Sequence, residues 1–111
     1  MTQQLTLTNQ KIKIYEYFGV EVFFMASDFQ ALVVYGEFQD KLSKIMIHLE
    51  NGVYSHISIL QVEGYEPLEE RELEKFSKLV GYNLSEIIRS WIDNFVYHKQ
   101  ISFEKILKPI L

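Results

Sequence analysis

Residues 42–62 read LSKIMIHLENGVYSHISILQV, and this stretch decides the fold class. On both sides of Asn51-Gly52, apolar and polar side chains alternate with a period of two, which is typical of half-buried β-strands. The Asn-Gly pair itself is a strong signal for a tight hairpin turn. The stretch therefore predicts two antiparallel strands, over residues 42–49 and 53–62, joined by a short turn.

Two registers compete at this turn. A two-residue Asn51-Gly52 turn mixes apolar and polar side chains on both faces of the hairpin, whereas a three-residue turn that adds Glu50 separates them. Because a one-residue slip reverses the faces of a strand, we expect the three-residue turn. One face then carries Ile45, Ile47, Leu49, Val53, Ile57 and Ile59, and the other carries Lys44, Met46, His48, Tyr54, His56 and Ser58.

Three further stretches upstream of the hairpin also predict strands: KIKIYEYF (11–18), VEVFFM (20–25) and FQALVVY (29–35). Gly19 permits a sharp turn between the first two. The third stretch is apolar on both sides, which is typical of a central strand that is covered on both faces. GEFQDK (36–41) then predicts a polar loop before the hairpin.

Downstream of the hairpin the apolar period changes to 3.6, which predicts two helices. The first covers PLEERELEKFSKLVG (67–81), with Pro67 at the first helical position and Gly81 ending it in the left-handed conformation. The second begins at Asn83, a good N-cap, with Glu86 as its capping-box partner. Its apolar positions form one buried face: Leu84, Ile87, Ile88, Trp91, Ile92, Phe95 and Val96.

Strands that precede helices, rather than alternate with them, predict an α+β fold. We expect an antiparallel meander of about five strands, followed by a C-terminal helix pair packed on one face. A chain of 111 residues fits a single domain. Its expected parts are residues 1–10 as a short strand (LTLT, 5–8) or an arm, 11–62 as the sheet, 67–98 as the helix pair and 99–111 as a packed strand or extended tail.

The composition argues against several classes of protein. There is no cysteine, which excludes disulfides, thiolate metal sites and a cysteine nucleophile. The net charge of −4, with Lys11 and Lys13 as the one small basic cluster, argues against a nucleic-acid partner. We find no signal peptide and no apolar run near the roughly 20 residues of a membrane helix, so we expect a cytoplasmic protein.

Motifs for nucleotide binding and hydrolysis are absent from the sequence: no GxxxxGK, GxGxxG, GxSxG or HExxH occurs. We therefore expect no cofactor, and a non-enzymatic role is favoured.

His48 and His56 are the candidate catalytic residues. In the expected register they share a face diagonally, with backbones about 7–8 Å apart, and Glu50 and Tyr54 lie nearby. Two imidazoles at this spacing are suited to sharing a metal ion or to acid–base catalysis. Two ligands are fewer than the three or four of a stable zinc site, so we expect no metal. Surface histidines without chemistry are the simpler interpretation.

Residues 11–25 carry more apolar side chains than two helices can cover. The expected alternation puts four large side chains on the face opposite the helices: Tyr15, Tyr17, Phe23 and Met25. Either sheet curvature and the tail cover them, or a partner chain does. Because tyrosine-rich surfaces are common at interfaces, we expect these four residues to form an interface in a homodimer or with another small protein.

The motifs YFGVEVFF (17–24), VVYGEF (33–38) and FEKI (103–106) resemble those of a small prokaryotic domain family of unknown function. Members of that family are often encoded beside another small protein, in a toxin–antitoxin-like arrangement. The resemblance therefore implies a small protein partner. The family's H-x-H-V signature before YGE is replaced here by ALVV (31–34), without histidine. Any chemistry of those histidines does not carry over, which favours an interaction role.

Together these observations predict a non-enzymatic protein–protein interaction module from a small bacterial or mobile-element system. One alternative is a small hydrolase or ribonuclease that uses the two hairpin histidines. Another is an acidic inhibitor of a nucleic-acid-binding protein, for which the net charge of −4 is the support.

Overall fold

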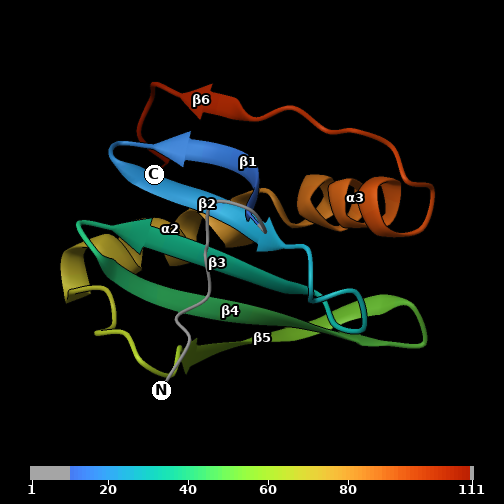
Figure 1. Cartoon of the computed structure of the whole chain (residues 1–111), viewed down its shortest axis with the longest axis horizontal. Coiled ribbons are helices and arrows are strands. Elements are labelled where there is room, and N and C mark those ends of the chain that lie inside the picture. Colours follow the sequence, from blue (N-terminus) through green and yellow to red (C-terminus); the bar gives the residue numbers. More distant parts are fainter. Residues whose placement is uncertain (1–10, 111) are drawn as a thin grey trace, which may run out of the picture.

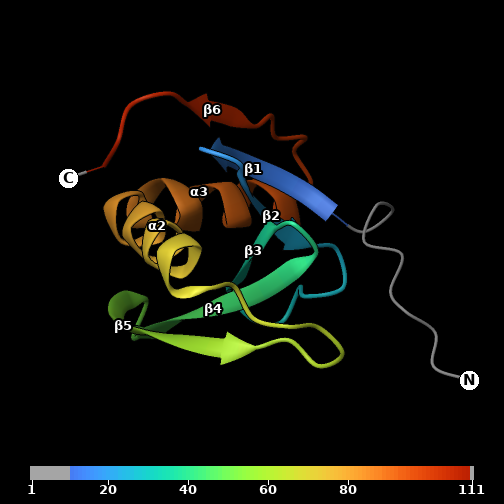
Figure 2. The ribbon, with the colours of Figure 1, turned by 90° about the vertical axis from the view of Figure 1, so that its left-hand side faces the viewer.

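The computed structural model describes residues 11–110 of the chain, and this part folds as an α+β domain. One sheet curves around two helices that pack on its concave side (Figure 1, Figure 2). The strands are β1 (Lys11–Tyr17), β2 (Val20–Met25), β3 (Val33–Phe38), β4 (Lys41–Glu50), β5 (Val53–Gln61) and β6 (Glu104–Ile106). The helices are α2 (Glu70–Tyr82) and α3 (Leu84–Phe95). The LTLT segment, expected as a strand or an arm, lies outside the described residues.

The six strands form one sheet in the order β5-β4-β3-β2-β1-β6. The first five make the expected antiparallel meander. The sixth comes from the tail and lies parallel to β1, with Tyr15 opposite Glu104 and Tyr17 opposite Ile106. The predicted count of about five strands was therefore one too low, because the tail pairs with the open edge of β1.

Tight turns join the hairpins of the meander. The central residues of the turns have positive φ: Phe18-Gly19, Gln39-Asp40 and Asn51-Gly52. This is the geometry of two-residue turns whose twist matches that of the flanking strands. The expected turn at Gly19 is confirmed, but the loop expected over residues 36–41 shrinks to Gln39-Asp40.

Gly36 explains why the third strand was misplaced. A glycine followed by polar residues suggested a loop, yet β3 starts only at Val33 and continues through Gly36 to Phe38. The ring of Phe76 in α2 packs directly against this glycine, and an added Cβ would lie 2.8 Å from the ring. The glycine is needed for a close approach of helix and sheet, rather than for a turn.

Two β-bulges decide which side chains face the helices. In β1 the pairing with β2 shifts between Lys13 and Tyr15, so Ile14 is the extra residue. In β5 the pairing with β4 shifts so that Ser55 is the extra residue. Each extra residue reverses the alternation of the side chains beyond it. A strict period of two therefore misassigns one end of each strand.

The predicted register of the β4–β5 hairpin is wrong for this reason. The turn is the two-residue Asn51-Gly52 form, and the bulge at Ser55 then restores an apolar side that faces the helices. Both registers considered from the sequence lacked a bulge. The observed pairs are Leu49–Tyr54, His48–His56, Ile47–Ile57 and Ile45–Ile59.

The first predicted helix exists but differs at both ends. It begins at Glu70 rather than at Pro67, and it runs through Gly81 to Tyr82. Gly81 has helical rather than left-handed geometry, since its φ is not among the positive values. The reason is that Asn83, rather than the glycine, ends this helix and donates its backbone N–H to the carbonyl of Leu79.

The second predicted helix is confirmed, with Asn83 at its N-cap position, but its expected buried face is only partly buried: Ile87 is fully buried, whereas Ile92 and Val96 are exposed. Its capping box does not form, because the Asn83 side chain also donates to the Leu79 carbonyl, at 3.1 Å. Glu86, the expected partner in the box, accepts a hydrogen bond from Tyr15 on β1 instead.

The main core lies between the sheet and the helices. Its fully buried side chains come from the middle strands and from both helices: Val20, Val22, Phe24, Val34, Ile45, Phe76, Leu79, Val80 and Ile87. A second, smaller cluster lies on the other face of the sheet and is flanked by Val62 and Tyr65 from the segment after β5. The expectation of a central strand covered on both faces is thus confirmed for the first part of β3.

Candidate interaction surface

Tyr15 and Tyr17 lie in the main core and are almost completely buried. The bulge at Ile14 turns both rings toward the helices. The Tyr15 hydroxyl donates to Glu86 Oε2 at 3.0 Å, and the Tyr17 hydroxyl accepts from the backbone N–H of Ile110 at 2.8 Å. Burial, reinforced by the bond to Glu86, raises the pKa of the Tyr15 phenol. The predicted exposure of these two residues is therefore wrong.

Phe23 and Met25 do face away from the helices, but they are also buried. The Phe23 ring stacks on Tyr35 with centroids 5.6 Å apart, and the Lys11 ammonium lies 4.7 Å from the Phe23 centroid. The Tyr35 hydroxyl donates to Asp28 Oδ2 at 2.7 Å, which ties the loop after β2 to this cluster. The predicted exposure of these two residues is also wrong, so the four side chains do not form an open aromatic face.

The hairpin brings His48 and His56 directly opposite each other, closer than the diagonal placement we expected. Their rings stack with centroids 4.3 Å apart and planes at 11°. His48 Nε2 lies 2.9 Å from Ser58 Oγ, and His56 Nδ1 lies 3.0 Å from Ser55 Oγ. Lone pairs of parallel stacked rings lie in separate planes, so they do not converge on one metal ion.

The neighbours expected to assist the histidines are not gathered around them. Tyr54 pairs with Leu49, which puts it on the side of the hairpin that faces the helices. Glu50 is linked to His56 only through the Ser55 hydroxyl, at a Ser–Glu distance of 3.4 Å. Among the described residues, no group of three or more histidine, aspartate or glutamate side chains is arranged to hold a metal.

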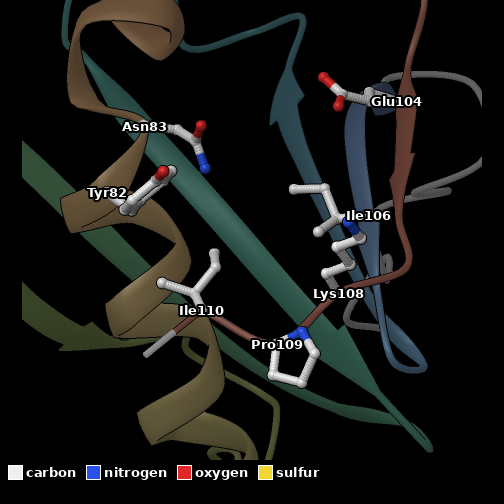
Figure 3. A pocket seen from close by; sticks show the side chains of 7 residues that line it. All are labelled: Tyr82, Asn83, Glu104, Ile106, Lys108, Pro109 and Ile110. Carbon is white, nitrogen blue, oxygen red and sulfur yellow. The ribbon is translucent and has the colours of Figure 1, made fainter.

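A cavity with a volume of about 460 Å³ lies between the α2–α3 junction and the C-terminal tail (Figure 3). Glu104 and Lys108 supply its charges, and no nucleophile lies beside a base among its lining residues. The cavity therefore suggests no reaction. It is lined by Tyr82, Asn83, Glu104, Ile106, Lys108, Pro109 and Ile110.

Strand β5 was not among the predicted sites, yet it is the most exposed strand of the meander. Seven of its nine residues are exposed and none is fully buried. The sheet order leaves one side of β5 without a neighbouring strand among residues 11–110. A row of backbone N–H and C=O groups along such an edge is available to pair with another strand.

Apolar side chains accompany this edge on both of its faces. Pairing with β4 puts Tyr54 and Ile59 on the side that faces the helices, and Val53 and Leu60 on the other side. The exposed fraction of the side chains is high: 67% for Val53, 49% for Ile59 and 37% for Leu60. The helix pair therefore stops short of covering the last strand.

The chemistry of β5 is unusual for an edge. Its sequence VYSHISILQ contains no Asp, Glu, Lys, Arg or Pro. Edge strands of monomeric proteins are commonly short or carry lysine, proline or inward-pointing charges, which prevent pairing with other chains. Apart from the bulge at Ser55, β5 has none of these protections.

A groove of about 400 Å³ lies between α3, the second half of β4 and residues 30–32, on the side of the helices. Leu49 of β4 and Ile92 of α3 are among its walls, and both are exposed. The indole N–H of Trp91, which also lines the groove, is buried and has no acceptor among the described residues. An unpaired buried donor costs about 1–3 kcal/mol, so this corner of the molecule is less stable than a fully hydrogen-bonded one.

One signal in the sequence could have located this surface. The last strand of a meander is an edge by construction, and residues 51–62 form the longest run of the sequence without Asp, Glu, Lys or Arg. The expected aromatic surface does not exist, because the bulge at Ile14 turns Tyr15 and Tyr17 into the main core and the second cluster buries Phe23 and Met25.

Comparison with known proteins adds no relative. No family model matches the chain, and no match was found among the curated proteins or the solved structures. Within residues 11–110, neither helix has the length and apolarity needed to cross a bilayer. The candidate surface is therefore assigned from its own geometry.

Proposed function

We propose that this chain is a non-enzymatic protein–protein interaction module that binds its partner by strand addition at β5. The observation that carries the proposal is the long, uncharged and exposed edge of this strand. In strand addition, main-chain hydrogen bonds supply affinity and alternate side chains supply specificity. Val53, Ile59 and Leu60 are the contacts that the edge offers to such a partner.

The proposed role, protein–protein interaction, is the one expected from the sequence, but the proposed interface is a different surface. The interface is no longer Tyr15, Tyr17, Phe23 and Met25, because these side chains are buried. The resemblance to prokaryotic domains of small gene pairs supports a setting in a bacterial or mobile-element system. We place the module in the cytoplasm, which suits a chain without cysteine.

Acid–base catalysis by His48 and His56 has less support. The two imidazoles stack on each other on the sheet surface, and their near neighbours are serine hydroxyls. The role of an acidic inhibitor also has less support, because several of the carboxylates form ion pairs with lysines of the same chain and are therefore not free to bind a basic partner. These pairs include Lys11–Glu21, Lys13–Glu16, Lys41–Glu69 and Lys78–Glu74.

The test uses an extended peptide as a probe of the edge. A synthetic peptide with the sequence of residues 53–61 is titrated into the isotope-labelled chain at low micromolar concentration. We expect the backbone amide signals of β5 to shift and their hydrogen exchange to slow, because new ladder hydrogen bonds protect them. The Leu60→Lys variant should lose this response, since it restores a charge of the kind that protects natural edges.

The matched control is Leu107→Lys, which makes the same replacement at a leucine that is 72% exposed and lies just beyond β6. It should respond like the wild type. If the peptide leaves the β5 amides unchanged, or if both variants respond alike, the proposed function is wrong.

A further inference from the structure

We infer that the strand added to β5 is β5 of a second copy of the same chain, paired antiparallel across a two-fold axis. This inference rests on the proposed function and names its partner. In such a dimer, the two six-stranded sheets join into one continuous sheet.

The absence of charge on β5 favours a second copy over another partner. Across a two-fold axis a strand meets its own sequence, so any charged residue near the centre would face its own kind. Residues from Val53 to Gln61 carry no formal charge when histidine is neutral. The chain as a whole has a net charge of −4, yet this segment brings no repulsion to the contact.

The distribution of apolar side chains also fits a second copy. A two-fold axis perpendicular to the sheet keeps the helices of both copies on the same side. Tyr54 and Ile59 of both copies then lie on that side of the joined sheet, and Val53 and Leu60 of both copies lie on the other side. A different partner would need a matching apolar stripe on each of its two faces, which the copy has by identity.

The first experiment measures self-association of the full chain by analytical ultracentrifugation over a range of concentrations. We expect a monomer–dimer equilibrium in the micromolar range. Leu60→Lys should weaken it about a hundredfold, because a charged side chain would then replace an apolar contact at the paired edge and would lose water on association. Leu107→Lys should leave the equilibrium unchanged, and circular dichroism should show that both variants remain folded.

The second experiment uses the absence of cysteine from the chain. Single cysteines are introduced at Ser55, Ile57 and Ser58 in β5, and at Leu107 as the control. Mild oxidation should link two chains most efficiently at the position nearest the two-fold axis and should not link them at Leu107. This readout does not depend on how well the lysine variant folds.

The outcomes separate this inference from the proposed function. A chain that stays monomeric at all concentrations but still takes up the 53–61 peptide at β5 overturns the second copy and leaves strand addition standing. A dimer that is insensitive to Leu60→Lys and that cross-links only at Leu107 overturns both. Cross-linking in β5 together with weakened association of Leu60→Lys supports both.

Discussion

The two edges of the sheet are built differently. β6 has three residues, two of which are charged, and Lys105 forms an ion pair with Glu16 of β1 at 3.4 Å. Pro109 follows this strand closely and cannot donate to a further ladder. β5 has nine residues and no charge. By the rules that keep natural sheets from pairing, one edge is closed and the other is open.

The same contrast continues across the outer face of the sheet. Near β6 this face carries a network in which Lys11 contacts Glu21 and Glu37, and Lys13 contacts Glu16. Near β5 it carries stacked imidazoles and exposed aliphatic groups. The difference teaches that connected ion pairs link the strands whose pairing is complete, whereas the unpaired strand itself carries no charge.

The largest effect on stability is expected from a substitution at Gly36, which lies on β3 between the two edge strands. Gly36→Ala should lower the free energy of unfolding by about 3 kcal/mol, because the new methyl group overlaps the buried Phe76 ring. Chemical denaturation measures this loss, and hydrogen exchange reports it strand by strand. Because β3 connects both halves of the sheet, protection should fall in β2 and β4 alike. Loss confined to β4 and β5 would instead show that the two edges unfold independently.

Gly81→Ala is the matched control. Gly81 lies in α2 with open space around the position of a Cβ. Alanine should therefore raise the stability by about 0.5–1 kcal/mol, as expected for glycine replaced inside a helix. A destabilised variant would indicate the left-handed helix end that the sequence suggested.

A smaller effect on the free energy of unfolding is expected from the ion pair between Lys11 and Glu21, and this effect depends on pH. Burial raises the pKa of Glu21, but hydrogen bonding and attraction from Lys11 outweigh it and hold the pKa below its ordinary value of 4.5. Glu21 therefore stabilises the fold above pH 4.5, and this contribution is lost as the pH falls through its lowered pKa. Lys11→Met should cost about 1 kcal/mol at pH 7 and make the loss in acid shallower.

Denaturant unfolding of both proteins between pH 7 and pH 3 measures this difference. Lys44→Met serves as the control, since Lys44 lies on β4 near the open edge, away from these carboxylates. If the stabilities of Lys11→Met and Lys44→Met depend on pH in the same way, the ion pairs of Lys11 do not stabilise the fold.

The smallest effect on stability is expected from removing the charges of β6. This change also tests most directly whether charge is what distinguishes the β6 edge from the β5 edge. Glu104→Val combined with Lys105→Val should change the free energy of unfolding by no more than about 0.5 kcal/mol, because both side chains are exposed. It should nevertheless open the second edge and produce assemblies larger than a dimer. Light scattering detects them, and an unchanged size distribution would mean that charge is not what closes this edge.

The sequence predicted the succession of strands and helices well, since each element has a clear apolar period. The meander and the helix pair required no knowledge of distant contacts. The tail strand was foreseen only as a strand or an extended segment, because its partner β1 lies at the other end of the described chain. Local pattern cannot choose between edges that are remote in sequence.

The side-chain orientations were predicted less well, and the cause lies in two residues. Ile14 and Ser55 are inserted into otherwise regular ladders, and neither differs chemically from its neighbours in a way that marks a bulge. Their positions follow from the twist and curvature of the sheet around the helices. As a result Tyr15 and Tyr17 were placed on the wrong face, and the two histidines were placed diagonally instead of in a stack.

The candidate surface was missed for a related reason. Sequence pattern shows which side chains are apolar, but their exposure depends on how far two helices extend across a curved sheet. Here the helices protect the strands up to β4 and leave β5 exposed. Only the assembled fold reveals that limit.

The parallel pairing of β1 with β6 has a consequence for the order of events during synthesis. β1 is made early, and its second ladder partner is made only after both helices have been translated. Until residues 104–106 leave the ribosome, a nascent chain has an unprotected strand at each side of its sheet. The ladder of β1 is therefore completed last, after the rest of the meander and both helices have been made.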